Sequence, residues 1–150
     1  MSDKSNRTTE YIRSMLKYCQ DVLDIQATSG GTYEAFISDK GYQYSVSFCV
    51  EQIGELAKKL RDEGFAKKYP NIRWNAIAGM RNHIAHGYGT IDLKVVYQVC
   101  AKDIPALLID CRHMLLNETR DVNEKMALAE ALKDDNHDGE SRIKREEREE

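Results

Sequence analysis

The chain has 150 residues, of which 41% are hydrophobic and 31% are charged. This length fits one domain, and the balance is typical of a globular protein rather than a disordered one. No window approaches 18 consecutive apolar residues, which excludes a membrane-spanning helix. The polar N-terminus leads into no apolar segment of the signal-peptide kind, so we expect a cytoplasmic protein.

The net charge of −3 is unevenly distributed along the chain. Residues 118–150 hold 12 acidic and 7 basic side chains, whereas residues 1–117 hold 13 acidic and 15 basic ones. Residues 1–117 are therefore nearly neutral, which is compatible with a nucleic-acid substrate. This near neutrality argues against the broad basic surface that dominates nonspecific DNA binders.

The four cysteines lie within long apolar-periodic segments and show no C-x-x-C spacing. Because a free cysteine behaves as a small hydrophobic residue, we expect reduced cysteines in the core. Zinc binding is the weaker alternative, since the paired short spacings of zinc sites are absent. The four are Cys19, Cys49, Cys100 and Cys111.

Apolar residues recur every third or fourth position in the first half of the chain, which predicts helices over residues 8–26 and 41–62. Thr8 or Thr9 can cap the first helix. A short helix is expected from Thr32 to Ser38. The chain has only two prolines, and this small number of turn-forming residues also favours helices over strands.

Two glycines of the second long segment have different expected roles. Gly64 lies where a helix C-terminal glycine is expected. Gly54 lies in the helix interior, where glycine costs about 1 kcal/mol relative to alanine. We interpret Gly54 as a point of close helix packing.

A third helix is expected to open at Pro70 and to end near Gly87 or Gly89. Thr90 or Asp92 can cap a fourth helix, whose apolar stripe runs to Leu115. Pro105 interrupts that stripe and predicts a kink or brief break near residues 102–103. Amphipathic helices joined by short loops predict an antiparallel bundle of four to five helices, which suits a homodimer.

The apolar pattern weakens after residue 117, so we divide the chain into a helical bundle, 1–117, and a charged extension, 118–150. A weak helical spacing extends to about Lys133. The polar run 134–139 is expected to end that helix, and the last dozen residues are expected to be frayed or disordered.

The segment Arg81-Asn82-His83-Ile84-Ala85-His86-Gly87-Tyr88 gathers polar, titratable groups where a helix gives way to glycines. Arginine binds phosphate through a planar, permanently charged fork, and histidine transfers protons near neutral pH. Carboxylate clusters for magnesium and a phosphate-binding glycine loop are absent from the sequence. These groups indicate phosphodiester cleavage of the ribonuclease kind, without a metal or another cofactor.

The geometry and the individual residues leave alternatives open. On a continuous helix Arg81 and His86 point about 140° apart, so the helix must deform, Arg81 must reach round, or a second subunit must contribute. Arg81 could instead pair with a carboxylate, and Tyr88 could be a core tyrosine. Trp74 and Met80 are expected in the core rather than in a base-stacking platform.

This segment matches R-x4-H-x-Y, and the chain resembles HEPN-domain proteins, specifically the HepT-type toxin ribonucleases. Flanking residues agree: Trp74, Gly79-Met80, Gly89-Thr90-Ile91-Asp92, Ile53-Gly54-Glu55 and Asp103-Ile104-Pro105. The resemblance covers roughly residues 8–116 and excludes the tail.

The resemblance implies an all-α HEPN bundle that forms a homodimer, with a metal-independent RNA-cleaving cleft between the subunits. Arg81 and His86 match the catalytic pair, and Asn82 matches the polar position that follows the arginine. Tyr88 matches the tyrosine that an MNT-type nucleotidyltransferase antitoxin AMPylates, which adds negative charge at the cleft. The implied protein is the toxin of a type VII-like toxin–antitoxin system.

Two other functions remain possible at this stage. The bundle could be a non-catalytic module that binds a nucleotide or RNA and partners a nucleotidyltransferase. It could also be a purely structural dimer. A comparison of RNA cleavage with RNA or nucleotide binding distinguishes these two functions from that of a ribonuclease.

Overall fold

A computed structural model describes the backbone of residues 2–85 and 92–149, and the side chains of residues 4–82, 84 and 92–138. Within these ranges the regular elements are all helical. The predicted all-α fold class is therefore confirmed.

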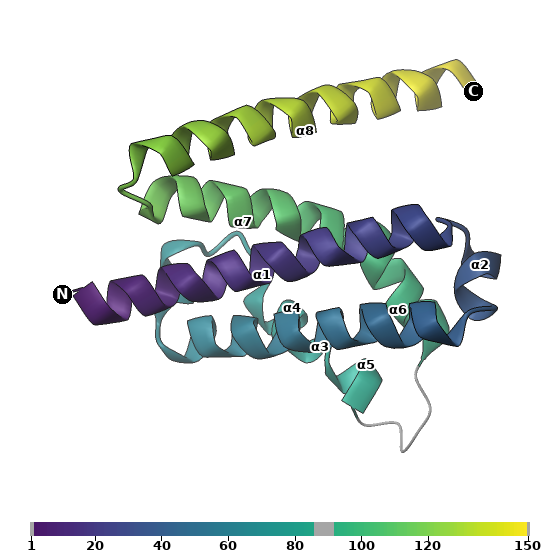
Figure 1. The fold of residues 1–150 in the computed structure, drawn as a ribbon, viewed down its shortest axis with the longest axis horizontal. Helices are drawn as coiled ribbons and strands as arrows, with labels where there is room; N and C mark the ends of the chain where they lie inside the picture. Colours follow the sequence, from purple (N-terminus) through teal and green to yellow (C-terminus); the bar gives the residue numbers. More distant parts are fainter. Residues whose placement is uncertain (1, 86–91, 150) are drawn as a thin grey trace.

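Three long helices form the centre of the molecule: α1 (Ser2–Ser29), α3 (Lys40–Asp62) and α7 (Ile104–Glu118). Helix α1 packs against both of the others, and it runs antiparallel to each of them (Figure 1). Their apolar stripes meet in one core. Its fully buried members include Ile12, Met15, Val22, Val46, Ile53, Leu60, Ile104, Met114 and Leu115.

The N-terminal helix begins earlier than its apolar stripe. We expected Thr8 or Thr9 to cap it, and this was wrong, because α1 already begins at Ser2. Both threonines lie inside the helix, and each hydroxyl donates to the carbonyl four residues back at 2.8 Å. Both side chains are buried, so these bonds satisfy hydroxyls that water does not reach.

The predicted short helix and the cap at Gly64 are both confirmed. Helix α2 (Tyr33–Ile37) begins after Thr32, whose side chain accepts a hydrogen bond from the Ala35 N–H. Gly64 follows α3 with φ +84°, a left-handed conformation that glycine adopts without strain. A 3-10 turn, Phe65–Lys68, comes next.

The single helix expected from Pro70 is instead two short helices, α4 (Trp74–Gly79) and α5 (Asn82–Ala85). Residues before Trp74 form tight turns: the Trp74 N–H bonds to the Ile72 carbonyl at 2.9 Å, and the indole N–H bonds to the Tyr69 carbonyl at 3.0 Å. Hydrogen bonds from residue i+3 to residue i then interrupt the helix around Arg81. The expected end at Gly87 or Gly89 lies outside the described residues.

Helix α6 (Leu93–Gln98) is capped by Asp92, as predicted, because the Asp92 carboxylate accepts a bond from the Val95 N–H. A π turn, Val99–Asp103, joins α6 to α7. Pro105 has no N–H to offer the carbonyl four residues back, and the Ile104 N–H bonds five residues back to Val99. The predicted interruption therefore takes the form of this π turn.

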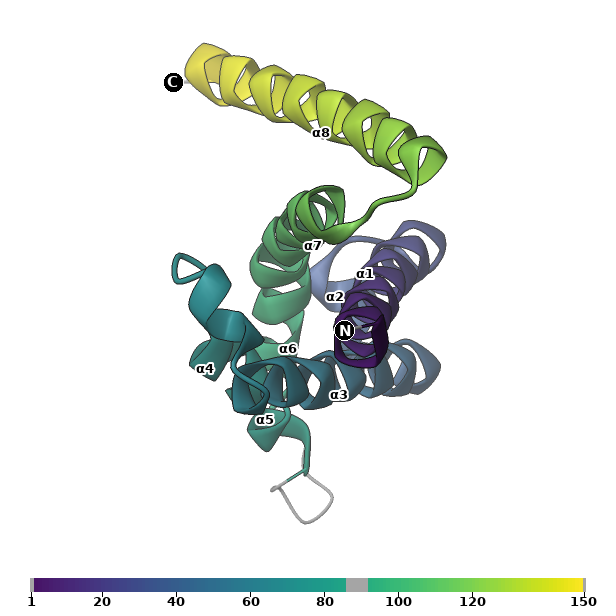
Figure 2. The same cartoon turned by 90° about the vertical axis from the view of Figure 1, so that its left-hand side faces the viewer.

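Helix α8 (Val122–Glu149) lies outside the central helices, against α7, at the opposite side of the molecule from α5 (Figures 1 and 2). The polar run 134–139 was expected to end this helix, and that expectation was wrong. Leu128 and Leu132 are buried, and Asp135 forms an ion pair with Arg112 of α7. These tertiary contacts stabilise a helix that its own sequence favours only weakly.

The four cysteines are free and buried, as predicted from their apolar surroundings. Trp74 and Met80 are also buried, which confirms that they belong to the core. None of the described helices is long and apolar enough to cross a membrane.

Candidate active site

The described part of the candidate site lies where α4, Arg81 and α5 pack against the middle of α3. Helix α4 packs along α3, and α5 contacts both α3 and α6. Ile84 of α5 is partly buried against the core, which holds this single turn in place. The segment with the R-x4-H-x-Y pattern therefore begins on a surface set by α3.

Gly54 lets the Arg81 backbone approach α3 closely, which agrees with the close packing predicted for this glycine. A methyl group placed on Gly54 would lie 3.3 Å from Cβ of Arg81 and 3.4 Å from the carbonyl oxygen of Ala78. The first distance is shorter than most Cβ contacts in proteins, and the second is at the short end of ordinary van der Waals contact. The absence of a side chain at residue 54 thus determines how near Arg81 lies to α3.

Arg81 is one-third exposed, and its guanidinium Nη1 donates to Oε1 of Glu55, the residue that follows Gly54. The carboxylate alternative considered for Arg81 is therefore present in the structure. Guanidinium carries five N–H donors, and this contact uses the donors of one nitrogen. Arg81 can keep Glu55 as a neighbour and still present N–H groups to an anion.

The other predicted site residues are only partly described. Asn82 is exposed and begins α5, directly after Arg81. His86 and Tyr88 lie outside the described residues, so the convergence of Arg81 with His86 stays a prediction. The interruption of the helix around Arg81 removes the continuous-helix geometry in which Arg81 and His86 diverge by about 140°.

Glu55 is the site residue for which the sequence analysis assigned no role. It was noted only within Ile53-Gly54-Glu55, as part of a resemblance. A helix-interior glycine next to an acidic residue was the available signal, because the glycine predicted a close neighbour. Residue spacing does not show which segment supplies that neighbour, because the answer depends on the tertiary structure.

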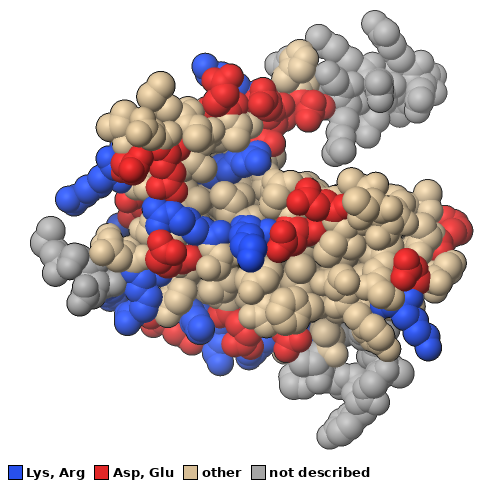
Figure 3. Space-filling view, viewed as in Figure 1, with Lys and Arg blue, Asp and Glu red and all other residues tan. Residues whose placement is uncertain are grey.

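The surrounding surface carries mixed charge. On the face shown in Figure 3, Lys and Arg side chains are interspersed with Asp and Glu. Near the site, Lys58 and Arg61 follow Glu55 on α3, and Arg61 bonds to both Asp62 and Asn75. Such a surface suits local recognition of phosphate more than broad electrostatic attraction.

A separate groove of about 390 Å³ lies on the other side of α4, against α6 and α7. Apolar residues of α4, α6 and α7 line much of it, together with two acidic residues, Asp103 and Asp110, and one basic residue, Arg73. Burial raises the pKa of the Asp110 carboxyl, although the nearby His113 opposes this shift. The groove thus carries more acidic than basic side chains, unlike the Arg81 side of α4.

Comparison with known proteins decides the family. The family described as "Ribonuclease HepT-like" matches residues 10–114. The chain belongs to the HepT-like ribonuclease family, of the HEPN type. The match contains α3, α4, Arg81 and the whole R-x4-H-x-Y segment, and it ends before α8 begins.

Individual relatives agree with this assignment. A candidate RNase of Methanocaldococcus jannaschii is 33% identical over 65% of this chain and 78% of its own length. The protein named "Probable ribonuclease HepT" in Thermococcus cleftensis is 31% identical over 63% of this chain and 90% of its own. A candidate RNase of Caldanaerobacter subterraneus is 29% identical over 72% and 94%, respectively. No solved structure matches the chain significantly.

Proposed function

We propose that this HepT-like protein is a metal-independent endoribonuclease and the toxin of a toxin–antitoxin pair. The observation that carries the proposal is the Arg81 guanidinium, which lies partly exposed against α3 at the start of the R-x4-H-x-Y segment and contacts Glu55 through one of its nitrogens. Family membership and the names of the relatives support the same reaction class.

In the proposed reaction, His86 removes the proton of a ribose 2′-hydroxyl, and the 2′-oxygen attacks the adjacent phosphorus. The bond from phosphorus to the 5′-oxygen breaks, and the imidazolium returns the proton to that oxygen. The products are a 2′,3′-cyclic phosphate and a 5′-hydroxyl. Arg81 stabilises the charge that develops on the phosphorane, and Asn82 helps to orient these groups.

The test is cleavage of single-stranded RNA in EDTA by the full chain. Arg81→Ala and His86→Ala should each abolish cutting without a change in the circular dichroism spectrum. Arg120→Ala is the matched control, because Arg120 is an exposed arginine between α7 and α8, far along the chain from the motif. Unaltered cutting in the Arg81 and His86 variants refutes the assignment. Intact RNA that is retained by wild type and released by Arg81→Ala supports the alternative, a non-catalytic binding module.

The proposed enzyme is a homodimer with its cleft between the subunits. Exposed apolar side chains on α3 support self-association: Tyr44 is 62% exposed and Phe48 is 55% exposed. They lie one turn apart, and Phe48 and Glu55 are seven residues apart, so all three share one side of the helix. Sedimentation should show a dimer that the double variant Tyr44→Ser, Phe48→Ser weakens. Val122→Ser, at an exposed apolar residue of α8, is the control.

The proposed regulator is an MNT-type nucleotidyltransferase that AMPylates Tyr88. The added phosphate repels the RNA backbone from the cleft. Co-expression with such a partner should add AMP-sized mass increments to the peptide that contains Tyr88. No increment in the presence of an active partner, or one that persists in Tyr88→Phe, contradicts this part of the proposal.

A further inference from the structure

Two adjacent residues of α3, Gly54 and Glu55, together contact the backbone and the charged end of Arg81. Gly54 meets the Cβ end of Arg81, where an added methyl group would lie only 3.3 Å away. Glu55 meets the guanidinium end through Nη1. Both ends of one long side chain are thus fixed by consecutive residues of one helix.

The two contacts restrict different parts of the arginine: one restricts the position of its Cβ, and the other restricts the position of its guanidinium. An arginine side chain has several rotatable bonds, and ordering it costs conformational entropy. The Gly54 contact sets where the side chain starts, and the Glu55 contact sets where it ends. An arginine ordered before substrate arrives loses less entropy when the phosphate binds.

We propose that Gly54 and Glu55 are a positioning pair that aims the Arg81 guanidinium at the scissile phosphate. This inference rests on the proposed ribonuclease function and deepens it. Glu55 contacts the Arg81 guanidinium, through which it acts in this proposal, so it is a positioning residue and not a catalytic one. The pair acts through Arg81 alone.

The opposite role for Glu55 is a carboxylate that competes with the phosphate for Arg81. The single-nitrogen contact favours positioning, because a competitor that saturates the arginine would engage it as a bidentate fork. The exposure of both groups, 31% for Arg81 and 42% for Glu55, also leaves the guanidinium accessible to a ligand while the pair is formed.

The test compares Glu55→Ala and Glu55→Gln with Glu51→Gln. Glu51 lies one turn earlier on α3, is partly buried like Glu55, and has no ion-pair partner among the described residues. The full-length variants are assayed for kcat and KM on single-stranded RNA, and for affinity to 2′-O-methyl RNA, which lacks the nucleophile. The Arg81 Nε–H signal is followed by NMR without RNA and is assigned by its loss in Arg81→Lys.

Positioning predicts that Glu55→Ala lowers kcat roughly 100-fold, the scale expected when a reacting group is displaced by about 1 Å. Glu55→Gln should be intermediate, since its amide oxygen still accepts a hydrogen bond from the guanidinium without the charge. The Arg81 signal should move to the position of a free guanidinium in Glu55→Ala and stay unchanged in Glu51→Gln. In an Arg81→Ala background, Glu55→Ala should have no further effect on the affinity for 2′-O-methyl RNA.

Three results overturn the inference: an unchanged kcat in Glu55→Ala, a lower KM with tighter binding of 2′-O-methyl RNA, or an equal loss in Glu51→Gln. Tighter binding identifies Glu55 as a competitor. These results differ from failure of the proposed function, in which Arg81→Ala itself retains wild-type cleavage.

Discussion

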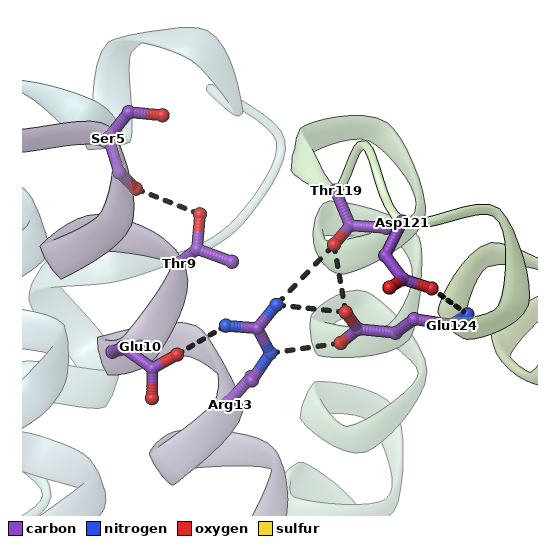
Figure 4. A network of polar contacts seen from close by, with 7 residues as sticks. All are labelled: Ser5, Thr9, Glu10, Arg13, Thr119, Asp121 and Glu124. Atoms are coloured by element: carbon purple, nitrogen blue, oxygen red, sulfur yellow. Dashed lines mark hydrogen bonds and ion pairs between the residues drawn. The ribbon is translucent and has the colours of Figure 1, made fainter. Parts of the chain in front are cut away.

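Arg13 of α1 and Glu124 of α8 are 111 residues apart in sequence and form a two-pronged ion pair, with Nε to Oε1 at 2.9 Å and Nη2 to Oε2 at 2.8 Å. Figure 4 shows that Arg13 also contacts Glu10, and that the Thr119 hydroxyl donates to Glu124 at 2.9 Å. The Asp121 carboxylate accepts the Glu124 N–H at 2.9 Å at the start of α8. This Arg13–Glu124 clasp attaches the helix outside the family match to the first helix of the bundle.

Breaking the clasp is expected to release the start of α8. Glu124→Gln removes the charge from a bidentate pair, and we expect a loss of about 1 kcal/mol, because solvent screens a pair at this exposure. Hydrogen exchange of the amides in 122–138 should accelerate, while that of α3 should stay unchanged. The matched control is Glu130→Gln, since the Glu130 contact with Lys133 is long and exposed. Equal acceleration in both variants contradicts the role of the clasp.

The clasp also predicts acid sensitivity of α8. The hydrogen bond from Arg13 lowers the pKa of Glu124 below its usual 4.5, although partial burial opposes the shift. A lowered folded-state pKa means that the stabilisation is fully present at neutral pH and is lost as the pH falls through the lowered value. The protection factors of α8 amides, which are corrected for the pH dependence of intrinsic exchange, should fall in the acid range for wild type when they are measured from pH 7 to pH 3. In Glu124→Gln this pH-dependent component should be absent.

The clasp illustrates which parts of the fold the sequence could predict. Periodicity located α3 and most of α1 and α7, since a helix that faces a core must repeat apolar residues every three or four positions. Periodicity carries no information about which helix supplies a partner. The contacts of Arg13 with Glu124, and of Arg81 with Glu55, therefore had to come from tertiary structure.

The wrong predictions for residues 134–139 and for Pro70 have the same cause, which is that tertiary contacts are not visible in the local sequence. The Asp-rich run of α8 reads as a helix end because its local propensity is poor, yet Leu132 and the ion pair of Asp135 hold it helical. Pro70 reads as a helix start, but the bond from the Trp74 indole to Tyr69 stabilises a turn there instead. For the candidate site, the motif points to Arg81 and Asn82, whereas no pattern indicates a role for Glu55, which lies 26 residues before Arg81.

The buried thiols should be chemically inert in the folded protein. Burial raises the pKa of Cys100 to about 12 and that of Cys49 to about 11, and the pKa of Cys111 lies well above its usual value through a hydrogen bond with Cys19 and burial. Because the thiolate is the reactive form, and because Cys19 is fully buried, Ellman's reagent at pH 8 should label none of the four rapidly. All four should react in guanidinium chloride. Rapid labelling of one native thiol contradicts the packing described here.

Gly54→Ala and Gly79→Ala separate close packing from helix propensity. Both glycines lie in helices, so alanine should gain roughly 0.5–1 kcal/mol at either position if nothing obstructs it. At Gly79 no atom of the described residues lies within 4 Å of the added carbon, and we expect higher stability with unchanged cleavage. At Gly54 the added carbon meets Cβ of Arg81 and the carbonyl oxygen of Ala78. The first atom is bonded directly to the backbone and the second belongs to it, so neither can rotate away. Helix α4 and Arg81 must then move from α3 by a few tenths of an ångström.

We therefore expect Gly54→Ala to lose the propensity gain and to lower kcat more than it lowers the melting temperature. Thermal unfolding and RNA cleavage on the same preparations measure the two effects. If the Gly54 variant is as stable and as active as the Gly79 variant, then the close approach of Arg81 to α3 has no functional role. Because the added methyl group carries no charge and makes no hydrogen bond, a selective loss of activity reflects the displacement of Arg81 and the end of α4 from α3.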